Sequence, residues 1–150
     1  MGCPYGVVSQ LVPSGHGPGE FGRLTTVSGD VRVKVPAAPE YGRMAEIAAV
    51  HAATHQGFPP HDIADLSQAI KEAVLLLLDP ERPAGSMEFD FQSKAGIVTI
   101  EALIDQRESK PIPHHKIDRF ETTAGALVDS WKLDPDEHRL WLQKSAKSGV

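Results

Sequence analysis

The chain lacks several features that would place it in a specialised class of protein. Its 150 residues include one cysteine, Cys3, so an internal disulfide framework is excluded and a reducing cytoplasm is the expected compartment. The longest apolar run, Ala73 to Leu78, is far shorter than the roughly 20 residues that a membrane-spanning helix needs. No basic stretch followed by an apolar stretch opens the chain, so no signal peptide is predicted.

An excess of positive charge is also missing. Lysine and arginine total 15 against 20 aspartate and glutamate residues, which gives a net charge of -5. A phosphate backbone requires a basic face, so direct nucleic-acid binding is not expected to be the main role, whereas a basic protein partner is compatible. Hydrophobic residues make up 41% of the chain, which predicts one globular domain with a substantial core.

Glycine and proline are concentrated at the start of the chain. Residues 1–30 hold seven of the 13 glycines and three of the 12 prolines, with no hydrophobic periodicity. We therefore predict a flexible tail over residues 1–28, with a docking peptide as the alternative, and one domain over residues 29–148. The opening Met1-Gly2-Cys3 is not expected to be lipidated, because Gly6 stands where the myristoylation pattern has Ser or Thr.

Hydrophobic periodicity predicts the elements of the domain. Alternating apolar and polar residues indicate strands, and apolar residues three and four apart indicate helices. A turn at Lys94 to Gly96 predicts a hairpin. The predicted strands are 31–36, 87–91, 97–104, 130–133 and 138–144, and the predicted helices are 40–55, 62–78 and 117–128. This order predicts an α/β (α+β) sandwich, in which a mixed, mostly antiparallel sheet is covered on one face by helices.

The pattern also predicts which faces of the first two helices are buried. The expected core-facing residues of the first helix are Met44, Ile47, Ala48, His51 and Ala52. In the second helix Asp62 is the predicted N-cap, and the C-terminal half around Leu75 to Leu78 is predicted to be buried all round.

Other kinds of site have little support. His51 and His55 lie four apart on a predicted helix, a spacing that suits a metal pair, but a third ligand would have to come from His114–His115. The sequence therefore predicts no metal site, with His51 facing the core and His55 at the helix end. Cys3 lies in the predicted tail, and no G-x-S-x-G nucleophile elbow is present.

The segment Asp65 to Ala73 resembles a known signature, D-L-x-x-A-x-x-E-A. It is similar to the helix of bacterial anti-sigma factors of the RsbW and SpoIIAB type, which are serine kinases with a histidine-kinase-like (GHKL) ATPase fold. The opening strand, Gly57-Phe58 and the segment Ala126 to Asp129 are also family-like, so the resemblance spans about residues 30–146 in order. It implies ATP or ADP with Mg²⁺ as cofactor and a sigma factor or an anti-anti-sigma protein as partner. Family members often form homodimers.

The resemblance implies a role for individual positions. Glu72 matches the acid that orients or deprotonates the attacking hydroxyl, and Asp105 matches the residue that binds the adenine amino group. Leu76 stands where the family has a Mg²⁺-binding Asn, and a leucine offers no oxygen ligand. The glycines that normally follow the adenine-binding Asp are missing. The glycine-rich lid over the phosphates is reduced to Gly125, and Thr122 and Thr123 precede it as phosphate contacts.

These features lead to a main hypothesis and two alternatives. The main hypothesis is an anti-sigma-like regulatory protein with an eroded nucleotide site. The alternatives are an active serine kinase that phosphorylates an anti-sigma antagonist, and a non-catalytic dimerisation or scaffold module with the strand Val31 to Val35 as an exposed edge. Glu72 has a second interpretation as a solvent-facing helix residue, and Asp105 as a residue that merely ends a strand.

Overall fold

The computed structural model describes residues 29–81, 84–106 and 110–146. The predicted tail over residues 1–28 therefore lies outside the described residues. Five strands, three α-helices and two short 3-10 helices make up the described chain. They are β1 (Gly29–Pro36), η2 (Pro39–Tyr41), α1 (Gly42–His55), α2 (Pro60–Leu77), β2 (Ser86–Lys94), β3 (Ile97–Asp105), α3 (His114–Thr123), η3 (Gly125–Leu127), β4 (Ser130–Asp134) and β5 (Arg139–Ser145).

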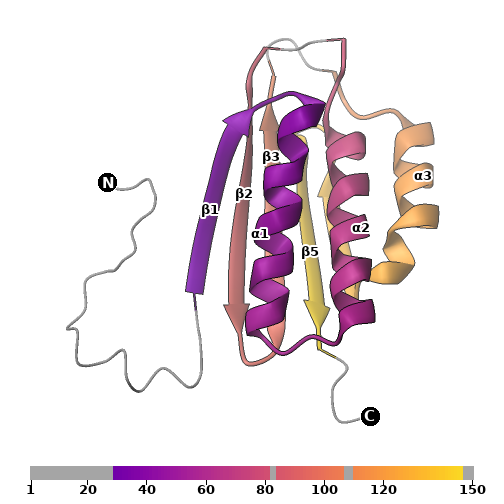
Figure 1. Ribbon diagram of the computed structural model, residues 1–150. Helices are drawn as coiled ribbons and strands as arrows, with labels where there is room; N and C mark the ends of the chain where they lie inside the picture. The colour runs from indigo at the N-terminus through magenta and orange to yellow at the C-terminus, as the bar shows by residue number, and fades with distance from the viewer. Residues whose placement is uncertain (1–28, 82–83, 107–109, 147–150) are drawn as a thin grey trace.

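The strands form one sheet, and the helices cover one of its faces (Figure 1). The sheet order is β1-β2-β3-β5-β4, and all four pairings are antiparallel. The predicted α+β sandwich with helices on one face is therefore confirmed, but the described sheet is antiparallel throughout and not mixed. In the part of the chain that the structure describes, the two edge strands are the eight-residue β1 and the five-residue β4. Among the described residues, no helix is long and apolar enough to cross a membrane.

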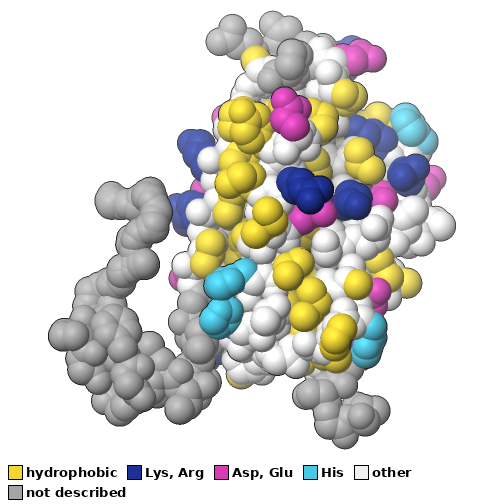
Figure 2. Space-filling model, viewed as in Figure 1, with side chains coloured by type: hydrophobic (Ala, Val, Ile, Leu, Met, Phe, Trp, Pro, Cys, Tyr) yellow, Lys and Arg dark blue, Asp and Glu magenta, His cyan; other side chains and the backbone are white. Residues whose placement is uncertain are grey.

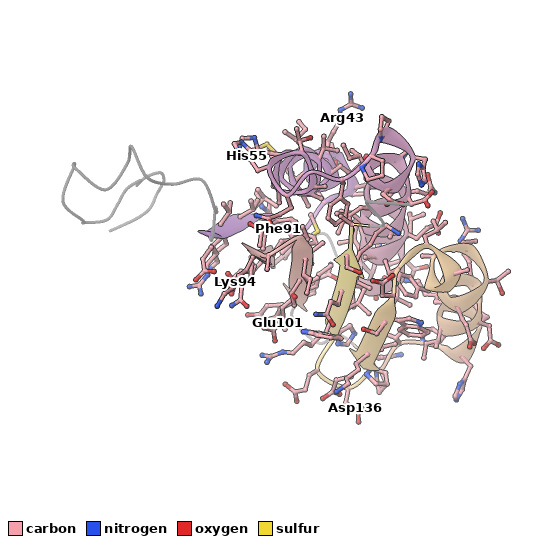
Figure 3. All side chains as sticks on the ribbon, turned by 90° about the horizontal axis from the view of Figure 1, so that it is seen from below. Arg43, His55, Phe91, Lys94, Glu101 and Asp136 are labelled. Atoms are coloured by element: carbon pink, nitrogen blue, oxygen red, sulfur yellow. The ribbon has the colours of Figure 1, made fainter. Side chains whose placement is uncertain are left out.

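The predicted hairpin between the two central strands is confirmed. Strands β2 and β3 pair over their whole length, from Ser86 opposite Asp105 to Lys94 opposite Ile97. Ala95 and Gly96 form the turn, and both have positive φ, at 54° and 80°. Two successive positive φ values are typical of the turn whose twist matches the hairpin. Alternate side chains enter the core, and Figure 3 shows Phe91 pointing toward the helices and Glu101 pointing away from them.

Helix α1 buries small residues instead of large ones, which corrects the predicted face. Met44 and Ile47 are 51% and 63% exposed, and His51 is also exposed. Of the five predicted core-facing residues only Ala52 is buried, and Ala48 is partly buried. The buried residues of α1 are Gly42, Ala45, Ala49, Ala52 and Ala53. Helix α1 contacts α2, β1, β2 and β3, and small side chains let its backbone approach these elements closely.

Two predictions for α2 are wrong. The helix begins at Pro60 after Pro59, so Asp62 lies inside the first turn and is not the N-cap. Asp62 is 2% exposed and lies 3.9 Å from Nζ of the equally buried Lys144 on β5. Leu75 is 47% exposed, so the C-terminal half of α2 is not buried all round. The predicted core leucines Leu76 to Leu78 are buried.

The later elements differ from their predicted bounds. The predicted helix over 117–128 is the helix α3, which starts three residues earlier and ends at Thr123, followed by the short η3. The predicted last strand begins one residue later, because His138 is buried with a φ of 53°, outside the strand region. On β5 the predicted alternation is confirmed, since Leu140 and Leu142 are buried and Trp141 faces the open side of the sheet.

Candidate functional site between helices α2 and α3

Glu72 is buried where α2 meets α3. Its side chain is 7% exposed, so the interpretation as a solvent-facing helix residue is wrong. Nε2 of Gln68, one turn earlier, donates a hydrogen bond to Oε2 at 3.1 Å. Nε of Arg119 on α3 donates to Oε1 at 3.3 Å. Both carboxylate oxygens are therefore engaged by protein groups, and a buried carboxylate needs such partners.

A second cation of α3 is bound to the end of α2. Nζ of Lys116 donates a hydrogen bond to the carbonyl of Leu78 at 2.9 Å. Burial lowers the pKa of Lys116, and the negative charge of Asp79 partly opposes that shift. Lys116 and Arg119 are three apart, so both lie on the side of α3 that faces α2.

A shallow depression lies between the two helices. It is lined by Glu72, Leu75, Leu76, Lys116, Arg119 and Phe120. Its volume of about 30 Å³ is room for two or three water molecules. A nucleoside triphosphate is far larger, and the buried Leu76 offers no oxygen to a hard cation. The residues around Glu72 therefore do not fit a Mg²⁺-nucleotide in this arrangement.

Asp105 lies at the same end of the sheet as the C-terminus of α2. It is exposed as the last residue of β3. The next residue, Gln106, is 4% exposed and binds the backbone of Asp79, where its Oε1 accepts from the amide at 2.9 Å and its Nε2 donates to the carbonyl at 3.1 Å. Gly85 approaches Asp105 so closely that a Cβ there would lie 2.0 Å from the Asp105 carbonyl oxygen. The backbones of Gly85 and Asp105 therefore lie directly against each other.

The three remaining predicted residues lie at the opposite end of α3. Thr122 and Thr123 are exposed, and the Thr123 hydroxyl donates to the carbonyl of Arg119 at 2.8 Å. Gly125 follows in η3, where an added Cβ would lie 3.2 Å from Nε1 of Trp131. Helix α3 rises about 1.5 Å per residue, so Thr123 is roughly 13 Å along its axis from the start near Leu78.

The structure therefore separates the predicted site residues. Glu72 lies at the middle of the α2–α3 contact, Asp105 lies at the end where α3 begins, and the Thr122 to Gly125 segment lies where α3 ends. Helix α3 runs beside α2, as Figure 1 shows. The ion pair between Glu72 and Arg119 joins α2 and α3 at this contact.

Sequence reasoning missed the residues that engage Glu72 and the end of α2. These are Gln68, Gln106, Lys116 and Arg119. Gln68 stands one turn before Glu72, and such a pair is a recognisable signal in a helix. Lys116 and Arg119 share one face of α3, but which face meets α2 depends on tertiary packing.

Comparison with known proteins gives no family assignment. No protein-family model matches the chain, and no curated protein matches it significantly.

Proposed function

We propose that this chain is an anti-sigma-like regulatory protein that acts by binding a protein partner, either a sigma factor or an anti-anti-sigma protein, in the cytoplasm. The observation that supports this proposal is that protein groups already engage the buried carboxylate of Glu72. Its two oxygens are taken by Gln68 and Arg119, and the neighbouring Leu76 is apolar and buried. In a GHKL-like protein, a junction of this kind lacks the metal ligand that phosphoryl transfer uses, which favours partner binding over catalysis.

The exposed apolar side chains of α1 support a binding role. Met44 and Ile47 are more than half exposed, and Tyr41 just before the helix is 39% exposed. Figure 2 shows a column of hydrophobic side chains on this side of the molecule. Contiguous exposed apolar residues mark interaction sites. We place the sigma-factor contact on this α1 surface, defined by Tyr41, Met44 and Ile47.

A two-hybrid and co-purification panel tests this proposal. It pairs the full chain with every sigma factor and every anti-anti-sigma protein of its source organism. Binding to one member is expected, and Ile47→Asp should abolish it because a buried charge would be introduced into the interface. Ile97→Asp on β3 is the matched control, since Ile97 is 36% exposed and lies outside both the α1 surface and the depression between α2 and α3. Binding to no member of a complete panel would refute the proposal.

The active serine kinase is the alternative to be separated in the same preparation. It requires transfer of labelled phosphate from ATP to a cognate antagonist, with Glu72→Ala inactive. Transfer that disappears in this variant would replace the binding-only function with kinase activity. No transfer, together with partner binding, supports the eroded site.

The edge strand β1 favours a second candidate function, homodimerisation. Among the described residues, β1 pairs with one strand, β2, and Val31 is 46% exposed. If the β1 strands of two copies pair antiparallel with Arg32 at the centre, Asp30 of each copy lies opposite Lys34 of the other. The dimer then contains two such oppositely charged pairs. Each Arg32 is already 3.3 Å from Glu88 and 3.2 Å from Asp90, which offsets repulsion between the two central arginines.

A further inference from the structure

Two histidines lie side by side on the exposed face of α1. His51 and His55 are one helical turn apart, and both are exposed. Their ring centroids are 4.3 Å apart, and the ring planes are inclined by 52°. Figure 3 shows His55 pointing away from the sheet, and Figure 2 shows histidine side chains below the apolar column.

The two rings have no other specific partners within the described residues. No hydrogen bond or ion pair engages either imidazole in residues 29–81, 84–106 and 110–146, and their mutual contact is the only aromatic one. This differs from His61, whose Nε2 lies 3.2 Å from Asp62. The ring nitrogens of His51 and His55 are therefore available to a ligand from solvent.

The sequence pattern predicted no metal site here, with His51 in the core, but His51 is exposed. We propose that His51 and His55 together chelate one divalent transition-metal ion of the class Zn²⁺, Ni²⁺ or Cu²⁺. Imidazole nitrogens bind such ions at about 2.0–2.1 Å, which puts the centroids of two rings on one ion roughly 5 Å apart. The present separation of 4.3 Å needs only a small rotation of the side chains. Two histidines four apart on one helix face supply two ligands of known zinc sites.

The ligand set defines what kind of ion is held. Within the described parts of the chain, no group of three or more His, Cys, Asp or Glu side chains could hold a metal ion. The site therefore has two protein ligands, and water fills the other positions. Imidazole suits zinc, nickel and copper, with copper bound most tightly, whereas Mg²⁺ and Ca²⁺ take oxygen ligands and are excluded. The site involves no residue of the α2–α3 junction, so it is independent of nucleotide binding.

Calorimetric titration of the untagged full-length chain with Zn²⁺ and Ni²⁺ tests the site. The Cys3→Ser background removes a competing thiolate. We expect one ion per chain, and His51→Ala and His55→Ala should each weaken binding at least tenfold. The matched control is the double variant His114→Ala/His115→Ala, which removes two exposed histidines of α3 and should bind as before. Adjacent helix residues point in different directions and cannot close on one ion.

A second measurement uses the Cys3→Ser chain with all seven histidines present. Paramagnetic Ni²⁺ should broaden the imidazole NMR signals of His51 and His55 before those of other histidines, and Mg²⁺ should change none of them. Alanine is a good helix former, so the variants should keep the helical circular dichroism of the parent. Affinity unchanged in both single variants, or no heat at about 1 mM metal, would overturn the proposal.

Discussion

Arg119 of α3 places its Nε 3.3 Å from a carboxylate oxygen of Glu72 on α2, although the two residues are 47 positions apart. The Glu72 side chain is 7% exposed and that of Arg119 is 61% exposed, so the pair lies at the rim of the junction. A carboxylate buried to this degree is stable only because a cation and an amide engage it. The pair therefore links the docking of α3 to the burial of Glu72.

Arg119→Ala should lower the free energy of unfolding by about 1 kcal/mol, because it leaves a buried carboxylate without its cation while solvent already screens much of the pair. In the Glu72→Gln background the same change should cost less, since a neutral amide does not need the cation. Urea unfolding of the four proteins measures the coupling. Strictly additive effects would contradict the ion pair.

Because Lys116 is partly buried, we expect the free energy of unfolding to rise at alkaline pH. Burial lowers its pKa in the folded state, so between the folded and unfolded pKa values the unfolded chain binds more protons. At neutral pH the amine is charged, and its burial lowers the free energy of unfolding by the full amount. As the pH rises toward about 10, the amine loses its proton and this cost disappears. The parent should therefore gain stability relative to Lys116→Met, with a slope below about 1.4 kcal/mol per pH unit.

Urea unfolding between neutral pH and about pH 10 measures this difference. Lys116→Arg is the control, because arginine stays charged and should show no such gain. A stability difference between the parent and Lys116→Met that is independent of pH would contradict the role of burial.

Gly85 and Gly96 give a matched pair of substitutions. Both have positive φ, at 115° and 80°. A Cβ at Gly85 would lie 2.0 Å from the Asp105 carbonyl oxygen, whereas nothing lies within 4 Å at Gly96. Gly96→Ala should cost about 1 kcal/mol from backbone strain alone. Gly85→Ala should cost at least about 2 kcal/mol more, and equal melting temperatures for the two variants would contradict the close contact.

The β1 edge predicts a charge-dependent dimer. Asp30→Lys turns two attractive cross-strand pairs into two repulsive ones. Each pair loses an attraction and gains a repulsion of a few tenths of a kcal/mol, so self-association should weaken about tenfold. Lys34→Asp should do the same, and the double reversal should restore association. Sedimentation velocity across a concentration series measures the effect. A parent chain that stays monomeric throughout would remove this second candidate function.

The hairpin and the sheet faces could be predicted because their signals are local. The alternation in β2 and β3 matches the side chains that the structure buries, and Ala95-Gly96 closes the turn. The same reasoning failed for α1, where one face carries large apolar residues and another carries alanines, and either could face the core. Hydrophobicity favoured Met44 and Ile47, but close packing on the sheet and α2 selects the alanines and leaves the bulky residues outside.

The sequence by itself determined the order of the elements, the two-layer architecture and the strand that ends at Asp105. Only the tertiary structure decided which helix faces are buried, where Glu72 points and which residues engage it. Strand alternation and turn geometry depend on neighbours along the chain. The burial of Glu72 depends on Arg119, and the exposure of His51 depends on how α1 packs. Such contacts join segments far apart in sequence, and no local periodicity records them.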